Sequence, residues 1–164
     1  MENRVKIMKL QVEKILDERQ VKYRLIKLTR KAYTVEDVIK YSDEEINSDE
    51  ICKTIILRGK KSGKNIAVFL KGRDKVSFSA LKNILGEEMA IANEKQVKEA
   101  SGVDPGAVCP FMLNVSLFTD KNVLALDVIN CGSGNHLYGL EFNASDLDKK
   151  LRCKVADLTK VSEI

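Results

Sequence analysis

Two short apolar segments joined by a glycine-containing turn constrain the fold of this chain more than any other feature. Residues Ile51 to Arg58 and Asn65 to Leu70 are rich in aliphatic side chains, and Gly63 lies in the six-residue connection between them. A connection this short joins antiparallel strands, because parallel neighbours need a crossover of about a dozen residues or more. The sequence therefore predicts a β-hairpin near the middle of the chain.

The rest of the chain alternates between helical and strand-like patterns. Helices are predicted over Val5–Leu16, from Thr34, over Ser79–Leu85 with Gly86 after it, from Asn93 to Gly102, and from Asn143 to Leu151. Further strands are predicted over Val21–Leu28, Met89–Ala92, Asn114–Phe118, Asp127–Cys131, Leu137–Phe142 and Cys153–Leu158, and the acidic stretch Asp43–Glu50 is predicted to be a loop. Because several strands meet through tight turns, we expect one α/β (α+β-like) domain over residues 1–164. Its central sheet is mixed and largely antiparallel, helices flank it, and the N-terminal helix lies within residues 1–20.

Composition excludes several classes of protein. Hydrophobic residues make up 44% and charged residues 32% of the 164, which suits a packed core. The longest uncharged stretch, Pro105 to Thr119, is too short for a membrane helix, and the N-terminus does not resemble a signal peptide, so we expect no membrane contact and a cytoplasmic location. The four cysteines form no CxxC pair and there is one histidine. We therefore expect small apolar cysteines, no metal and no cofactor.

Positive charge concentrates on the predicted hairpin, although the net charge is only +4. Between Ile51 and Lys75 the single acid is Asp74, and the basic residues are Lys53, Arg58, Lys60, Lys61, Lys64, Lys71, Arg73 and Lys75. Such a cluster can bind the phosphates of a nucleic acid. Solvated lysines that discourage edge-to-edge pairing of strands are the alternative, and charge alone favours that alternative.

Lys53 is a charged residue on a strand face that is otherwise apolar. Side chains alternate along a strand, so Lys53 shares a face with Ile51, Ile55 and Leu57, and an apolar face usually points to the core. Burying an ammonium is costly, so the side chain must reach an anion, a carbonyl or a cleft. The alternative is a lysine near the strand end whose stem packs while its amine reaches water.

Two loops carry the other candidate residues. The first, Gly102 to Phe111, contains both prolines of the chain and can hold exposed N–H groups in a rigid cradle. The second, Asn130 to His136, is a polar glycine turn that contains the only histidine. It lacks the sequence of a phosphate-binding P-loop, and no nucleophile elbow surrounds any serine. Taken alone, each loop is more simply interpreted as an ordinary turn.

In this order, the motifs resemble the YbaK / prolyl-tRNA synthetase-associated domain family of aminoacyl-tRNA deacylases and editing domains. The strand Ile51 to Leu57 matches, as do the loop Gly102-x-x-Pro105-Gly106-x-Val108-x-Pro110-Phe111 and the tail Leu126-Asp127-Val128-x5-Gly134-x5-Leu140-x-Phe142. The resemblance extends from Val21 to Thr159. Two departures, Cys109 where a serine is frequent and Met112 where a glycine often follows the phenylalanine, are expected near the amino-acid pocket.

The resemblance implies the compact fold of that family and a trans-editing hydrolase that deacylates mischarged aminoacyl-tRNA, with a small amino acid on proline tRNA as the family-based expectation. The partners it implies are the aminoacylated 3′ end of tRNA and prolyl-tRNA synthetase. Its key lysine matches Lys53. Expected substrate-binding residues are Gly102, Pro105, Gly106, Ala107, Val108, Gly134, Asn135 and His136, and expected tRNA-binding residues are Arg58, Lys60, Lys61, Lys64, Lys71 and Arg73.

Two other functions remain open from the sequence. A module of the same fold could bind aminoacyl-tRNA or a synthetase without hydrolysis. An esterase for small acylated molecules would act on aminoacyl esters that lack tRNA and would be indifferent to charge reversal at Lys60, Lys61 and Lys64.

Overall fold

The central hairpin is present in the computed structural model, which describes residues 9–160. Strand β2 (Cys52–Gly59) pairs antiparallel with β3 (Asn65–Lys71) over seven residue pairs. Both strands begin and end within one residue of the predicted positions, so the hairpin is confirmed.

The hairpin belongs to a five-stranded sheet with the order β4-β2-β3-β5-β8. Its other strands are β4 (Met89–Ile91), β5 (Leu117–Asp120) and β8 (Lys154–Ala156). Strand β4 is antiparallel to β2, whereas β5 runs parallel to β3 and β8 runs parallel to β5. The sheet is therefore mixed, as the sequence predicts.

A second sheet is three-stranded and antiparallel, with the order β1-β7-β6. It consists of β1 (Tyr23–Lys27), β7 (Tyr138–Asn143) and β6 (Val128–Gly132). One parallel bridge, between Ile51 and Asn130, connects it to β2. The chain before Ile51 forms a short 3₁₀ helix, η1 (Ser48–Glu50), and β2 makes no further bridge to β6 within residues 9–160, so the expected central sheet divides in two. The mixed, largely antiparallel α/β class is confirmed.

Six α-helices within residues 9–160 flank these sheets. They are α1 (Gln11–Glu18), α2 (Val35–Tyr41), α3 (Phe78–Leu85), α4 (Glu94–Ser101), α5 (Lys121–Leu124) and α6 (Ala144–Lys150). None of them has the length and apolar composition that crossing a bilayer requires.

Local capping interactions explain where several helices begin and end. Asn93 accepts a hydrogen bond from the Gln96 N–H at 2.9 Å, and the Gln96 side chain accepts one from the Asn93 N–H, which forms a capping box at the predicted start of this helix. Thr34 caps α2 through the N–H of Asp37. Gly102 ends α4 with φ of 76°, a left-handed conformation that favours glycine.

Some predicted elements differ from the structure. The N-terminal helix lies within residues 1–20 as expected, but it covers Gln11–Glu18 rather than the predicted Val5–Leu16, because Leu10 is extended; residues 1–8 lie outside the described chain. Asn143 stands at the N-cap position of α6 without a side-chain hydrogen bond, and that helix ends at Lys150. The helix α5 and the 3₁₀ helix inside the acidic stretch were not predicted.

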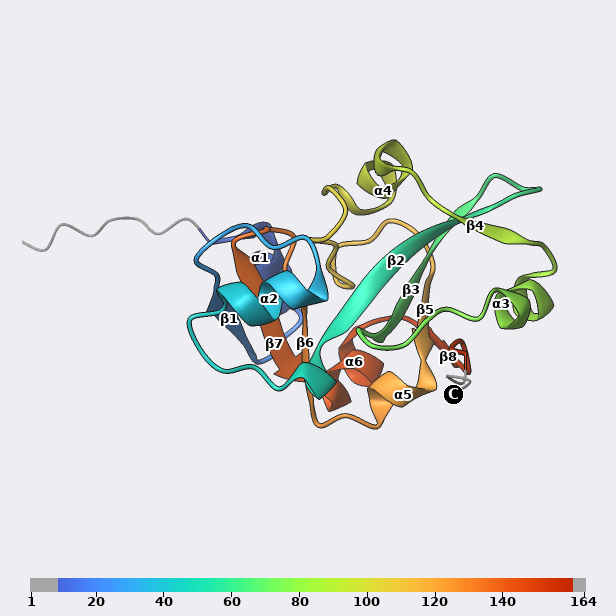
Figure 1. Ribbon diagram of the computed structural model, residues 1–164. Coiled ribbons are helices and arrows are strands. Elements are labelled where there is room, and N and C mark those ends of the chain that lie inside the picture. Colours follow the sequence, from blue (N-terminus) through green and yellow to red (C-terminus); the bar gives the residue numbers. More distant parts are fainter. Residues whose placement is uncertain (1–8, 161–164) are drawn as a thin grey trace, which may run out of the picture.

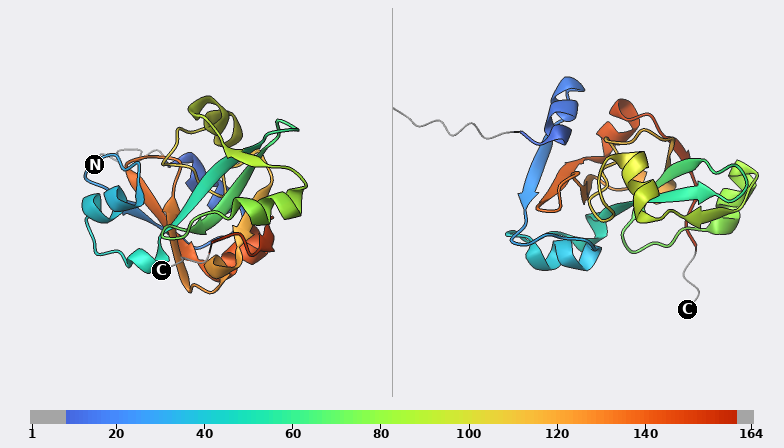
Figure 2. Two further views of the ribbon diagram at one scale, coloured as in Figure 1. Left: turned by 45° about the vertical axis from the view of Figure 1, so that its right-hand side comes forward. Right: turned by 90° about the horizontal axis from the view of Figure 1, so that it is seen from above.

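Strand β3 is buried on both faces and separates two hydrophobic clusters. Phe69 points into the larger cluster, which Leu16 of α1 also joins, whereas Leu70 points into a smaller cluster that contains Leu57 of β2 and Leu81 of α3. Burial on both faces explains the unbroken apolar run of this strand. Figure 1 and the view from above in Figure 2 show the three-stranded sheet with α1 and α2 at one end of the molecule and the hairpin turn with α3 at the other.

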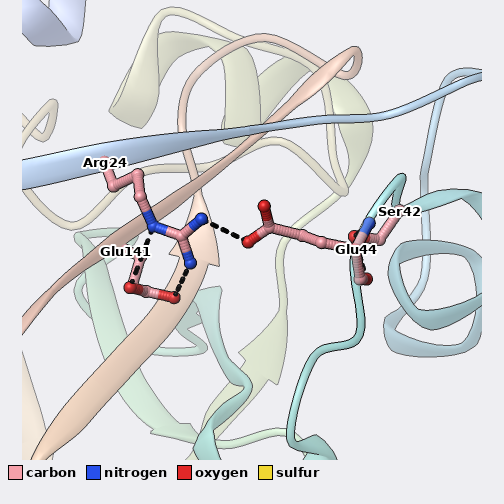
Figure 3. A network of polar contacts seen from close by, with 4 residues as sticks. All are labelled: Arg24, Ser42, Glu44 and Glu141. Carbon is pink, nitrogen blue, oxygen red and sulfur yellow. Dashed lines mark hydrogen bonds and ion pairs between the residues drawn. The ribbon is translucent and has the colours of Figure 1, made fainter.

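A surface network fixes the loop after α2 to the three-stranded sheet (Figure 3). Arg24 of β1 donates to both carboxylate oxygens of Glu141 on β7, at 3.3 and 3.0 Å, and it also pairs with Glu44. The backbone N–H of Glu44 donates in turn to the Ser42 hydroxyl. These contacts hold the segment that closes one side of the site described next.

Candidate functional site

A cavity of about 310 Å³ lies between the hairpin and the three-stranded sheet. Strand β4 covers β2 only at residues 57–59, and β6 reaches β2 only at Ile51, so the edge of β2 between these points lacks a strand neighbour within residues 9–160. Residues 51–56 line the cavity along this edge. Residues of the loops 105–108 and 132–136, of the segment 32–35 and of the chain after α2 (Ile46) are among those that line its other sides.

Lys53 lies on this edge, half-buried. Its Nζ donates to the backbone oxygen of Gly72 at 3.1 Å, so the expectation that the amine must reach a carbonyl or a cleft is confirmed. Burial lowers the pKa of the Lys53 amine, and the carboxylates of Asp74 and Glu36 oppose that shift. An ammonium carries three N–H donors, so two remain for a ligand in the cavity.

The proline-bearing loop faces the same cavity. Pro105, Gly106, Ala107 and Val108 all line it, but Gly102 does not, because that glycine only ends α4. The N–H of Ala107 donates to the Asp104 oxygen at 3.4 Å, whereas those of Gly106 and Val108 donate to no group within residues 9–160. Two main-chain donors are therefore available beside the cavity.

Close backbone contacts set the position of this loop. Gly106 has φ of 97°, and a Cβ there would lie 2.7 Å from the Tyr33 oxygen. A Cβ on Gly132 of β6 would lie 2.4 Å from the Val108 oxygen. Each contact requires glycine, so the loop is held against both the segment 32–35 and β6.

The glycine turn supplies His136 and Asn135 to the cavity, but not Gly134. Gly134 instead donates from its N–H to the Ala107 oxygen at 2.8 Å, which connects the two predicted loops. The Asn135 side chain is itself engaged, because its Oδ1 accepts from the Leu137 N–H at 2.9 Å.

The environment of His136 fixes its tautomer. Its Nδ1 lies 2.8 Å from the backbone oxygen of Ala32, and because a carbonyl oxygen only accepts, Nδ1 carries the proton. In the neutral ring Nε2 is then an acceptor. Nε2 is buried and has no hydrogen-bond partner in the described chain. The ring packs against Tyr33 with 4.4 Å between centroids, and Tyr33 is 53% exposed.

Several cavity residues were missed by the sequence analysis, and Tyr33, Thr54 and Asn130 are the ones that matter for the chemistry of the site. Thr54 Oγ1 and Asn130 Oδ1 are both buried without a hydrogen-bond partner in the described part of the chain. A polar residue between the buried Ile129 and Cys131 was the signal that could have identified Asn130. No comparable signal marks Tyr33, which contacts His136 from a distant part of the sequence.

The cysteines behave as expected for small apolar residues. Cys52 and Cys131 line the cavity, and burial raises the pKa of Cys52 to about 12 and that of Cys131 well above its ordinary value. Both thiols are therefore protonated, which makes them poor nucleophiles. Cys109 lies in the core and Met112 packs near Gly134, so neither lines the cavity as the family pattern suggested. Residues 9–160 contain no group of three or more His, Cys, Asp or Glu placed to hold a metal.

The six proposed tRNA-binding residues form two groups at opposite ends of the hairpin. Arg58, Lys60, Lys61 and Lys64 lie at its turn, whereas Lys71 and Arg73 lie at its open end. At about 3.3 Å per residue, the turn is about 23 Å from Lys53. Lys60 pairs with Glu88 at 3.5 Å, and Arg73 pairs with Asp49 at 2.6 Å. These two cations are thus partly compensated by acids.

Comparison with known proteins gives consistent matches. Residues 29–159 match the model of the aminoacyl-tRNA editing domain family. The proline–tRNA ligase of Caldicellulosiruptor saccharolyticus is 28% identical over 131 residues, and that of Desulfotalea psychrophila is 25% identical over 119 residues. The alignments cover 79% and 72% of this chain but 22% and 20% of the ligases, so the chain spans about a fifth of these curated relatives.

Solved structures share the fold. The hypothetical protein APE2540 superposes with a TM-score of 0.83 at 25% identity, over 92% of this chain and 100% of that one. A candidate trans-editing enzyme for prolyl tRNA synthetase superposes with a TM-score of 0.77 at 16% identity, over 94% of this chain and 100% of that one. Since the family model covers most of the sequence and the fold agrees, this chain belongs to the aminoacyl-tRNA editing domain family.

Proposed function

We propose that the chain hydrolyses the ester bond of a mischarged aminoacyl-tRNA, with a small amino acid on proline tRNA as substrate. The observation that carries the proposal is that the half-buried amine of Lys53 and the loop Pro105 to Val108 border one cavity. A cavity of about 310 Å³ is at the lower end of the size range of small-molecule sites. The cavity accommodates the aminoacyl group and part of the terminal ribose.

The reaction needs a stabilised oxyanion. Water adds to the acyl carbon, the carbonyl oxygen becomes negative, and the bond to the ribose oxygen then breaks as that oxygen takes up a proton. The Lys53 ammonium and the N–H groups of Gly106 and Val108 would donate to the negative oxygen. Fixed donors in a site of low polarity stabilise such a charge more than water does.

His136 and Tyr33 would position the rest of the substrate. The unpartnered Nε2 of His136 can accept a hydrogen bond from the attacking water or from the terminal ribose. The exposed Tyr33 ring, already packed on His136, offers a face for the terminal adenine. Asn135 would contribute through its remaining amide N–H groups. Gly102 and Gly134 would act by shaping the two loops.

The basic groups of the hairpin would bind the tRNA backbone. The 3′ end of a tRNA is single-stranded and a few nucleotides long, so an acceptor arm can contact the hairpin turn while its last nucleotide enters the cavity. Lys61 and Lys64 form no salt bridge in the described chain, unlike Lys60. Action on tRNA charged by prolyl-tRNA synthetase is supported by the sequence match to proline–tRNA ligases, and the proposal adds that this action takes place in trans and in the cytoplasm.

The test is single-turnover deacylation of a panel of mischarged tRNAs by the wild type, by Lys53→Ala and by a matched control, Lys95→Ala, which removes an exposed lysine of α4. Loss of one oxyanion donor typically lowers the rate by about 10²–10³, and we expect this loss for Lys53→Ala with unchanged tRNA binding. Lys95→Ala should retain the wild-type rate.

The same panel separates the other functions. Wild-type binding of aminoacyl-tRNA without turnover would replace the proposal by a binding module. Equal rates on aminoacyl esters with and without tRNA would indicate a small-molecule esterase. An unchanged rate for Lys53→Ala would remove Lys53 from the reaction.

A further inference from the structure

Asn130 is a buried amide with an unused acceptor in the cavity wall. The residue is 4% exposed, it lines the cavity, and its Oδ1 has no hydrogen-bond partner in the described chain. Buried polar atoms in native proteins almost always have a partner. An orphaned acceptor that faces a cavity therefore indicates a partner that arrives with the ligand.

The sheet geometry places Asn130 beside Lys53. On β6, Ile129 and Cys131 point into the larger core cluster, so Asn130 points to the opposite face. Asn130 pairs with Ile51 across the one bridge between the sheets, and Lys53 lies two residues further along the same face of β2. Lys53 therefore lies two residues along β2 and one strand spacing across from Asn130. Regular strand geometry then places the Cβ atoms of Asn130 and Lys53 about 8 Å apart.

The two side chains offer opposite chemistry to one ligand. Lys53 only donates hydrogen bonds, which suits the acyl oxygen, whereas the amide oxygen of Asn130 only accepts. An aminoacyl ester carries N–H donors on its α-ammonium close to the acyl carbonyl, and some amino acids add a hydroxyl. A donor of this kind would satisfy Asn130 Oδ1 while Lys53 holds the carbonyl.

We propose that Asn130 is a specificity-determining residue that binds a hydrogen-bond donor of the aminoacyl group, either the α-ammonium or a side-chain hydroxyl. The proposal rests on the proposed function, because it takes the aminoacyl ester as the ligand. A site built to hydrogen-bond a substrate group rejects an analogue without it, since its own polar atom is then left unpaired.

The experiment measures binding rather than turnover. The probes are adenosine analogues whose 3′ position carries an amide-linked alanyl, propionyl or seryl group, which the protein cannot hydrolyse as esters; the propionyl group lacks the α-ammonium and its N–H donors. Calorimetry gives their dissociation constants for the wild type, Asn130→Leu and Asn130→Asp. Asn65→Leu is the matched control, because Asn65 Oδ1 is also buried without a partner in the described chain but lies outside the cavity.

We expect the wild type to bind the disfavoured probe about tenfold or more weakly. That probe is the propionyl one if Asn130 binds the ammonium, and both the alanyl and propionyl ones if Asn130 binds the hydroxyl. Asn130→Leu should lose that preference, whereas Asn130→Asp, which keeps the acceptors, and Asn65→Leu should retain it. Comparison within the wild type needs no variant, so a folding defect of Asn130→Leu does not prevent the test.

Three results would overturn the proposal. Equal wild-type affinity for all three probes would mean that the site does not recognise a hydrogen-bond donor of the aminoacyl group. An unchanged preference in Asn130→Leu would mean that another residue recognises it. A loss in Asn130→Asp equal to that in Asn130→Leu would mean that the amide donates instead. In these cases the deacylase proposal survives, whereas failure of the wild type to bind any probe contradicts the proposed function itself.

Discussion

A single ammonium on an otherwise apolar strand face carries most of the proposed chemistry. Lys53 has one backbone partner, the Gly72 oxygen, and it is held at the edge of a cavity rather than in bulk water. Burial favours the neutral amine, and Asp74 and Glu36 favour the charged form. The charge needed to stabilise an oxyanion is thus kept in a place where water screens it weakly.

The lowered pKa of Lys53 predicts an alkaline limit to activity. Only the protonated amine stabilises an oxyanion, so the rate should fall as pH rises through a pKa below the ordinary value of 10.5. Lys53→Arg stays charged over this range, so its rate, although lower, should show no such fall. Single-turnover rates between about pH 7 and 10, after subtraction of spontaneous ester hydrolysis, measure both profiles. A wild-type profile that continues to rise in parallel with Lys53→Arg would contradict the requirement for an ammonium.

At the level of elements, the site depends on how closely strands and loops approach one another. Gly132 and Gly139 face each other in the β6–β7 pair and both line the cavity, but their surroundings differ. A Cβ on Gly132 would meet the Val108 backbone at 2.4 Å, whereas one on Gly139 would make an ordinary contact with Ile26 at 3.5 Å. The close approach of the loop 105–108 thus requires glycine at position 132, whereas nothing comparable requires it at position 139.

The pair Gly132→Ala and Gly139→Ala tests this difference. Gly132→Ala forces the loop away from β6, and overpacking of this kind costs about 1–3 kcal/mol of unfolding free energy. Gly139→Ala should be neutral or stabilising by about 0.4–1 kcal/mol, because alanine restricts the unfolded chain. Urea unfolding of both variants gives the comparison. Equal stability of the two would mean that the loop is not held as described.

The elements that the sequence predicted are those fixed by local interactions. The Asn93–Gln96 capping box and the left-handed Gly102 are set by neighbours within one or two turns of helix, and the hairpin is set by two apolar segments and the short turn between them. The way the two sheets meet depends instead on the single bridge between Ile51 and Asn130, which are far apart in the sequence.

The residues of the candidate site also fall into those that a local sequence pattern indicates and those that only the fold brings together. Lys53 and the proline-bearing loop stand out in the sequence because a charge or a rigid residue is unusual where it lies. Tyr33 and Asn130 become part of the site only through the fold: the hydrogen bond that brings His136 to the segment of Tyr33 spans 104 residues. No local pattern predicts a contact of that kind.

Over the whole molecule, the proposed function assigns the positive charge of the hairpin to a long ligand rather than a small one. The hairpin turn and the cavity are separated by the length of β2, and the net charge of +4 alone would not attract a polyanion strongly. A nucleic acid that reaches from the turn to Lys53 would release counterions along its path.

The salt dependence of deacylation tests whether the tRNA backbone contacts the hairpin turn. For the wild type, log kcat/KM for deacylation should fall linearly with log salt concentration. Replacing Lys60, Lys61 and Lys64 by alanine should reduce the slope by up to about 2, at about 0.7 for each phosphate contact on a single strand. The triple variant Lys95→Ala, Lys98→Ala and Lys149→Ala removes the same charge elsewhere and should keep the wild-type slope. Equal slopes for both variants would mean that the turn does not contact the tRNA.

The position of the acyl group relative to Lys53 is the central point of this account, and a crystal structure with the amide-linked alanyl adenosine determines it directly. We predict that the acyl oxygen accepts a hydrogen bond from Lys53 Nζ, with the adenine against Tyr33 at the cavity mouth. An analogue bound elsewhere, or bound in the cavity with its acyl oxygen away from Lys53, would contradict the account.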